Sequence, residues 1–313
     1  MRDSSAIFTD KPFSSEKSII LAGGTGELGK RIASYLVQYG ATVIALVRKG
    51  SSAVSINTLR AVGIQIVQVD FANRSQLVQA CSGGSCVISA LNGLQNVIID
   101  TQTALLDAAV EAGVPRFIPS DYSIDYTKLP FGNNRNLDLR RQFAAIADRA
   151  PIKTTSILNG MFTNLLTGQA PVILFGMKRV VYWENAEQLL DFTTIDNTAE
   201  YTARVAIDEA TPRFLRIAGE VTNANGLKET ASKISGDEFR LLKAGQLSRL
   251  RTIIKITKTI LPQKKEIFPP WQGMQYLHDM FTGMPKLQPL DNNRYTGIHW
   301  TTVREILEKE KKG

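Results

Sequence analysis

The chain has 313 residues, of which 43% are hydrophobic, and its formal net charge is +8. This length allows one large or two modest domains with a sizeable core, and no stretch approaches the ~18 uncharged apolar residues of a transmembrane helix. Residues 1–17 are polar and charged and lack the apolar centre of a secretory signal. We therefore expect a flexible arm over residues 1–17 and a cytoplasmic protein. His278 and His299, the only histidines, lack metal-ligand spacing, so no metal site is predicted.

The first regular element is an apolar run that leads into a glycine-rich turn. Residues 19–22 form the continuously apolar strand that is typical of a parallel sheet covered on both faces. Gly23, Gly26 and Gly29 follow, and an amphipathic helix begins among them. In a dinucleotide site the first glycine permits a tight turn, the second lets the pyrophosphate approach the backbone, and the third lets the helix pack against the strand. The helix would point its first N–H groups at the phosphates, so we predict a dinucleotide site.

The second predicted strand indicates which dinucleotide binds. Residues 41–47 are apolar and end at Arg48, about twenty residues beyond the glycines, with no carboxylate nearby. An acidic residue at this place usually binds the ribose 2′-hydroxyl of NAD, whereas an arginine suits the 2′-phosphate of NADP. Guanidinium pairs with phosphate through two parallel hydrogen bonds. The sequence favours NADP(H); the alternative is a solvated cation at the strand end.

Strands and helices continue to alternate up to residue 158. We predict further strands over residues 64–70, 86–91, 116–120 and 154–158, and helices over residues 75–81, 97–112 and 137–150. This order predicts an α/β fold with a doubly wound parallel sheet, a Rossmann domain over residues 18–158. Ligands bind beyond the carboxyl ends of the strands in such sheets.

Residues 159–313 are less regular, and we expect a smaller C-terminal α+β substrate-binding region, with some of its strands returning to the main sheet. Short strands are predicted near residues 176–182, 188–194 and 213–218, and helices over residues 198–208, 227–235 and 302–311. The last helix begins with a capping box formed by Thr302 and Glu305. Aromatic and methionine side chains between Trp271 and Met284 suit either an apolar pocket wall or an ordinary core. The substrate is therefore expected to be small and apolar or aromatic.

A basic stretch over residues 240–265 contains eight Lys and Arg residues and no Asp or Glu, which matches the whole net excess. Its Leu and Ile side chains can form one apolar face of a helix. One interpretation is an interfacial helix attracted to anionic lipid. The other is a helix whose apolar face covers the substrate pocket and whose charges are solvated. We expect the second, and hence no membrane contact.

The chain resembles the NmrA-like, isoflavone-reductase-like members of the atypical short-chain dehydrogenase/reductase group, from Ile19 to about Leu307. The resemblance rests on the glycine turn, Val47-Arg48, residues 111–122, Arg140-Arg141, residues 191–196 and residues 300–304. It implies an NADPH-dependent oxidoreductase. It also implies a role for residues around the cofactor. Thr25, Gly26 and Leu28 would line the pyrophosphate, and Arg48 would bind the 2′-phosphate. Asp70 and Phe71 would border the adenine, Ala90 and Leu91 would flank the adenosine ribose and diphosphate, and Phe162 would lie by the nicotinamide.

Two departures from the family pattern concern the proton donor. Reductases of this group have Pro-Ser-Glu-Phe-Gly after the fifth strand, where this chain has Pro-Ser-Asp-Tyr-Ser from Pro119 to Ser123. They also have a catalytic lysine four residues before the paired arginines, where this chain has Asn136. We therefore expect Tyr122 to be the acid, with its pKa lowered by Lys128. The alternative is that Tyr122 merely replaces a pocket phenylalanine and Lys128 is solvated.

Three functions are consistent with these features. The first is an NADPH-dependent oxidoreductase that reduces a small apolar or aromatic carbonyl or conjugated compound. The second is a non-catalytic NAD(P)-binding, redox-sensing regulator that acts through protein partners, which the missing lysine makes credible. The third is a membrane-surface or assembly factor that uses the basic stretch. The expected partners are a small-molecule substrate, and either a second copy of the chain or a regulatory protein; no nucleic acid is expected.

Overall fold

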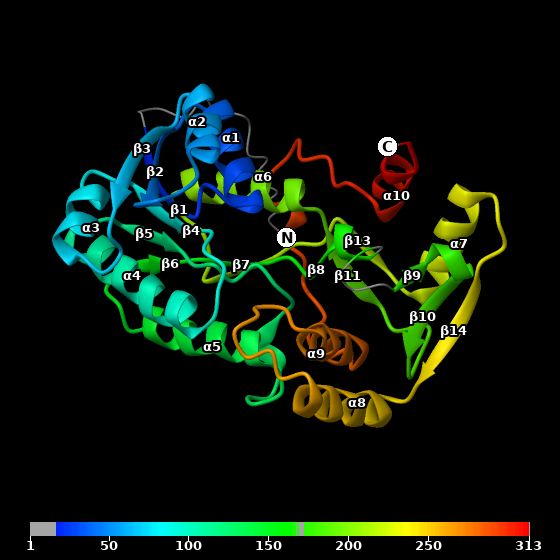
Figure 1. The fold of residues 1–313 in the computed structure, drawn as a ribbon. Coiled ribbons are helices and arrows are strands. Elements are labelled where there is room, and N and C mark those ends of the chain that lie inside the picture. Colours follow the sequence, from blue (N-terminus) through cyan, green and yellow to red (C-terminus); the bar gives the residue numbers. More distant parts are fainter. Residues whose placement is uncertain (1–16, 167, 169–171, 313) are drawn as a thin grey trace, which may run out of the picture.

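The computed structural model describes residues 17–166, 168 and 172–312, so the predicted arm lies outside the described residues except for Lys17. Its centre is a six-stranded sheet in the order β3-β2-β1-β4-β5-β6 (Figure 1). All five neighbouring pairs are parallel, and this order is that of a doubly wound sheet. The strands are β1 (Ser18–Ala22), β2 (Thr42–Arg48), β3 (Gln65–Val69), β4 (Cys86–Ser89), β5 (Arg116–Ile118) and β6 (Lys153–Thr154).

Helices cover both faces of this sheet, which explains why its central strands are apolar throughout. One face packs against α1 (Glu27–Gln38), α2 (Ala53–Ala61) and α6 (Ile195–Ile207). The other packs against α3 (Arg74–Cys81), α4 (Gln102–Glu111) and α5 (Arg135–Ala147). A π-helical turn over Asn96–Thr101 precedes α4. The sequence analysis did not predict α2, which buries only Ile56 and Leu59.

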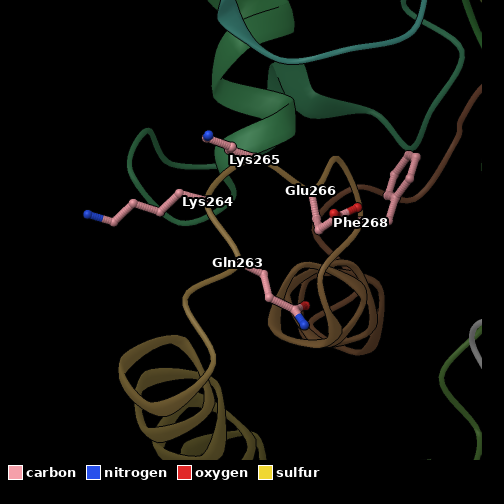
Figure 2. Close-up of a pocket in the computed structure, with 5 residues that line it drawn as sticks. All are labelled: Gln263, Lys264, Lys265, Glu266 and Phe268. Carbon is pink, nitrogen blue, oxygen red and sulfur yellow. The ribbon is translucent and has the colours of Figure 1, made fainter.

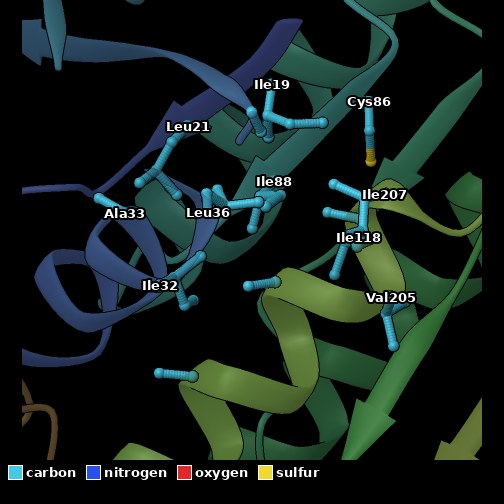
Figure 3. Packing of buried hydrophobic residues seen from close by; sticks show 14 of the residues in the cluster. Ile19, Leu21, Ile32, Ala33, Leu36, Cys86, Ile88, Ile118, Val205 and Ile207 are labelled. Carbon is cyan, nitrogen blue, oxygen red and sulfur yellow. The ribbon is translucent and has the colours of Figure 1, made fainter. Parts of the chain in front are cut away.

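The core of the first half includes side chains from the second half. Helix α6 packs along α1, and Val205 and Ile207 join Ile32 and Leu36 in one buried cluster over β1 and β4 (Figure 3). Because α6 completes the cover of the sheet, the core extends across the predicted boundary at residue 158.

The predicted sixth strand is in fact two strands with different partners. β6 (Lys153–Thr154) pairs with β5 in the main sheet, whereas β7 (Ser156–Leu158) pairs with β12 (Phe214–Arg216). The change occurs at Thr155, whose N–H still donates to Phe117 O, while the next N–H, of Ser156, donates to Arg213 O. Among the described residues of the second half, β12 thus lies beside β7 and does not pair with the six-stranded sheet.

The described residues of the second half form two further three-stranded sheets and four more α-helices around their own core. One sheet contains β8 (Met161–Phe162), β11 (Leu190–Thr193) and β13 (Glu220–Thr222). The other contains β9 (Ile173–Leu174), β10 (Arg179–Trp183) and β14 (Arg240–Gly245). The helices are α7 (Ala224–Ser235), α8 (Leu247–Ile260), α9 (Pro270–Phe281) and α10 (Val303–Lys312).

The basic stretch is not one helix. Its first six residues form β14, because they pair in parallel with β10, and α8 begins only at Leu247. The helix that we expected to cover a substrate pocket therefore spans only Leu247–Ile260. No helix in the described part of the chain is long and apolar enough to cross a membrane.

Candidate active site

The turn between β1 and α1 shows which glycines the fold itself requires. Gly23 has φ +85°, and a Cβ added to it would lie 2.5 Å from Ala90 O. A Cβ added to Gly29 would lie 2.1 Å from Gly23 O. Gly26 differs: it is exposed, has φ −81° and ψ 166°, and an added Cβ would meet only Gly23 O, at 3.4 Å. Packing therefore requires Gly23 and Gly29, and the surface outside Gly26 is open to a ligand.

Helix α1 begins at this open surface without a side-chain cap. Gly26 is its N-cap residue, whereas Asn73 and Asn134 cap α3 and α5 through their side chains. The first N–H groups of an uncapped helix have no hydrogen-bond acceptor within the helix, and the positive end of the helix dipole favours an anion. The glycine turn can accordingly hold a phosphate group. Thr25 and Leu28, the other residues predicted to line it, are half-buried on either side of Gly26.

The ends of β2 and β3 carry the next predicted residues. Arg48 is the last residue of β2 and is exposed, and its guanidinium has no hydrogen bond or ion pair within the described ranges. Asp70 follows β3 and shapes the turn into α3, since its Oδ1 accepts from Ala72 N at 2.9 Å. Phe71 is half-buried against the core under α3 and α4. Arg48 is thus a free cation, whereas Asp70 has a structural partner.

The ends of β1, β4 and β5 are tied together at the glycine turn. Ala90 N donates to Ala22 O at 2.8 Å, and Leu91 O accepts from Ser120 Oγ at 2.6 Å. Ala90 and Leu91 are both half-buried, so part of their surface is accessible beside the glycine turn. Phe162, on β8, is half-buried and packs against the core that contains α1 and α6. The structure therefore brings Ala90 and Leu91 against Gly23, as expected of one site.

Tyr122 and Lys128 do not form the expected acid. Tyr122 is only 7% exposed and lies in the apolar core with Ile118 and Ala199. Burial raises the pKa of its hydroxyl well above the usual range, so the predicted lowering by Lys128 is wrong. Because the Tyr122 ring lies in an apolar cluster, the structure favours the alternative interpretation, in which Tyr122 takes the place of a buried phenylalanine.

Lys128 belongs instead to a partly buried group of charges. Its Nζ donates to Lys286 O at 2.5 Å and lies 3.5 Å from Asp125 Oδ2. Arg216 Nε donates to the same Asp125 oxygen at 2.8 Å, and Lys286 pairs with Asp191. Lys128 is therefore held by protein partners, Lys286 O and Asp125, while its side chain keeps 31% exposure. A small hollow is lined by Lys286 and Asp191 together with apolar side chains, among them Ile124, Leu190 and Met280.

Asp121 holds the loop after β5 in place. It is fully buried and accepts hydrogen bonds from Tyr126 Oη at 2.8 Å and from Ser156 Oγ at 2.5 Å. Arg213 in turn donates to Ser156 Oγ at 2.6 Å. Burial raises the pKa of the Asp121 carboxyl. These contacts fix the position of the loop after β5 relative to β7.

Asn136, where the family pattern has a lysine, is also fixed by its neighbours. It is 2% exposed, its Nδ2 donates to Ile267 O at 2.9 Å, and its Oδ1 accepts from Arg135 Nε at 3.1 Å. Arg135 further donates to Glu266 O and Ile267 O. The amide of Asn136 thus anchors the loop between α8 and α9.

Sequence analysis missed the polar contact between α5 and α9. Asn134 Nδ2 donates to Asp279 Oδ2 at 3.0 Å, and Gln272 Nε2 donates to Asn134 Oδ1 at 2.7 Å. All three side chains are buried. Two signals could have revealed α9: Pro270, a favourable first helical residue, and polar residues recurring every three or four positions among aromatic ones. A separate open hollow on the α8–α9 loop is lined by Gln263, Lys264, Lys265, Glu266 and Phe268 (Figure 2).

Comparison with known proteins agrees with this architecture. The bifunctional pinoresinol-lariciresinol reductase 1 of Linum usitatissimum is 26% identical over 239 residues, which are 71% of this chain and 76% of that protein. A crystal structure of an isoflavone reductase superposes with a TM-score of 0.80 at 18% identity, covering 95% of this chain and 100% of the other. The binary complex of leucoanthocyanidin reductase with NADPH, from Vitis vinifera, superposes with a TM-score of 0.77 at 16% identity, with coverages of 95% and 100%. The family model of the NmrA-like family matches residues 15–262. The chain therefore belongs to the NmrA-like family.

Proposed function

We propose that this chain is an NADPH-dependent oxidoreductase that reduces a small apolar or aromatic carbonyl or conjugated compound. One observation carries the proposal: the glycine turn is open outside Gly26, and Arg48, which has no partner among the described residues, lies at the end of the neighbouring strand. A diphosphate suits the first feature and a 2′-phosphate suits the second. The names of the relatives support a reductase, since one is a pinoresinol-lariciresinol reductase, and one structural neighbour, a leucoanthocyanidin reductase, was solved with NADPH.

In this proposal the chain's own residues bind and orient the cofactor. Thr25, Gly26 and Leu28 would hold the pyrophosphate, and Arg48 the 2′-phosphate. The remaining contacts would come from strand ends around the same crevice: Asp70 and Phe71 at the adenine, Ala90 and Leu91 at the ribose and diphosphate, and Phe162 at the nicotinamide. NADPH, when bound, supplies a hydride.

Hydride delivery leaves an anion on the substrate, which needs a nearby positive charge or proton donor. Lys128 suits this role better than Tyr122 does, because its side chain keeps 31% exposure, whereas the Tyr122 hydroxyl lies in the core. We propose Lys128 as that cation.

A non-catalytic regulator is the second candidate. The specific observation in its favour is that the Asn136 amide is engaged with Ile267 O and Arg135, so this position supplies no ionisable group. Such a protein would bind NADPH tightly and turn over no substrate.

Titration with NADPH and NADH tests the cofactor. Arg48 should favour NADPH by one charge-assisted interaction of about 1.5–3 kcal/mol, which is about 10- to 100-fold in Kd. Arg48→Asp should remove the preference, and Lys49→Asp, which makes the same charge change at the next exposed residue, should keep most of it. Equal affinities for the two cofactors in the unmutated protein would contradict the assignment.

Turnover then separates the two candidates. An enzyme should oxidise NADPH with at least one compound in a panel of aromatic aldehydes, enones and quinones. Tight NADPH binding without oxidation by any of them would favour the regulator.

A further inference from the structure

The end of α8 and the loop after it form an exposed surface of mixed apolar and basic character. We call it the α8 surface and define it by six exposed residues: Lys255, Ile256, Ile260, Leu261, Lys264 and Lys265. Helix α8 lies at the outer edge of the molecule, away from the six-stranded sheet (Figure 1).

Only part of the apolar face of α8 packs against the protein. Leu250 and Ile254 are buried with Trp271 of α9. By contrast, Ile256 is 52% exposed, Ile260 is 70% exposed and Leu261 is 48% exposed. Ile256 and Ile260 are four residues apart in the helix, so their side chains lie on the same side, one turn from each other. The helix therefore presents adjacent aliphatic side chains to the surroundings.

The cations of this surface are not neutralised by the protein. Within the described ranges, none of Lys255, Lys264 and Lys265 forms an ion pair. One exposed carboxylate, Glu266, lines the same hollow as Lys264 and Lys265, so the three lysines outnumber the local negative charge. Some other cations do have close carboxylates, as in the Arg213–Asp148 pair at 2.6 Å and the Arg216–Asp125 pair at 2.8 Å. The side chains of Lys264 and Lys265 extend away from α9 (Figure 2). The positive charge of the α8 surface is therefore available to interact with an anion outside the protein.

We propose that the α8 surface docks this protein onto an anionic membrane surface. Ile256, Ile260 and Leu261 enter the interfacial region, and the lysines lie among the lipid headgroups. Interfacial binding strengthens with buried apolar area and with attraction between Lys or Arg and anionic lipid. Protein interfaces, by contrast, are depleted in lysine and enriched in aromatic side chains and arginine, so this composition favours a membrane over an acidic protein. From the sequence we expected no membrane contact, because we expected the whole apolar face of this helix to cover the substrate pocket. Ile256 and Ile260 are exposed, so at least that part of the face does not cover a pocket.

Co-sedimentation of the full chain with vesicles tests the proposal. At about 0.15 M salt, binding to phosphatidylserine–phosphatidylcholine vesicles should exceed binding to phosphatidylcholine vesicles by at least ~10-fold, and higher salt should weaken it. The double variant Lys264→Gln/Lys265→Gln should lower the partition coefficient by about 10-fold or more. Lys153→Gln/Lys233→Gln removes the same charge from two exposed residues of other elements and should change little.

A second pair of substitutions separates a membrane from an acidic protein partner. Ile256→Ser/Ile260→Ser keeps every charge and should lower vesicle binding by at least ~10-fold, with the thermal transition and NADPH binding retained. Soluble polyglutamate is the competing probe. Membrane docking is overturned if anionic vesicles show no preference, if the Lys264/Lys265 and control variants bind alike, or if the isoleucine variant binds vesicles like the unmutated chain. It is also overturned if polyglutamate binds as tightly as anionic vesicles do, which would indicate an acidic partner.

Discussion

The glycine turn and the contact between α5 and α9 both gather polar groups, but they use them in opposite ways. In the turn, the N-terminal N–H groups of α1 have no side-chain cap and Arg48 has no partner within the described residues. At the α5–α9 contact, Asn134, Gln272 and Asp279 are buried and bonded to one another. The first region is built to receive a ligand from outside. The second holds two halves of the chain together, and its groups are no longer available to a ligand.

The two regions also differ in how far apart their residues lie in the sequence. The residues of the turn lie within seven positions of one another, from Gly23 to Gly29. The α5–α9 partners lie 138 and 145 positions apart. A local motif carries its own geometry, whereas a long-range network exists only after the chain has folded.

The strongest way to break the comparison is to change the open turn without disturbing the fold. Gly26→Val should displace the pyrophosphate from two or more charge-assisted hydrogen bonds of about 1.5–3 kcal/mol each, which weakens NADPH binding by about 10²–10⁴-fold. The midpoint of thermal unfolding should remain that of the unmutated protein, because Gly26 has ordinary backbone angles and room for a Cβ. Isothermal titration and thermal unfolding measure the two effects.

Gly29→Ala is the matched control for this change. Its Cβ would lie 2.1 Å from the carbonyl oxygen of Gly23, so overpacking should cost about 1–3 kcal/mol or more of folding stability. Normal NADPH binding by a folded Gly26→Val variant would place the cofactor elsewhere.

The second prediction concerns the charged group around Lys128. Lys128→Met should lower kcat by about 10²–10³-fold if its ammonium stabilises the developing anion, with little change in the NADPH Kd. Tyr122→Phe should change kcat much less, because that hydroxyl is buried in the core and its pKa is raised by burial. Steady-state kinetics on the best compound of the panel measures both. The opposite ranking would restore Tyr122 as the acid.

A third prediction compares two asparagine helix caps. Asn73→Ala removes one exposed hydrogen bond, to Gln76 N, and should cost about 1 kcal/mol of folding stability. Asn134→Ala also removes a cap, but it leaves Gln272 and Asp279 buried without this partner, and should cost about 2–4 kcal/mol. Denaturant unfolding gives both values. Equal costs would mean that the α5–α9 network adds nothing beyond the cap.

The smallest effect belongs to the capping box of α10. Hydrogen bonds from Thr302 and His299 lower the pKa of Glu305 to about 2, from an ordinary value of 4.5. Because the folded-state pKa is depressed, this stabilisation is present above pH 4.5 and is lost as the pH falls towards 2. Glu305→Gln should therefore lower the stability at neutral pH by less than about 1 kcal/mol, and the difference should vanish at low pH. Glu308→Gln, on an exposed position of the same helix, should show no such pH dependence.

The sequence by itself determined the parts in which neighbouring residues supply the geometry. The apolar strands, the glycine turn, Arg48 at the end of β2 and the Thr302–Glu305 box were all predicted, since each depends on residues within a few positions of one another. Tertiary structure decided the rest. It split residues 153–158 between two sheets, made residues 240–245 a strand by pairing them with β10, and drew Tyr122 into the core beneath α6. In each case a distant segment supplied the hydrogen-bond or packing partner, and no local pattern in the sequence specifies which segment that is.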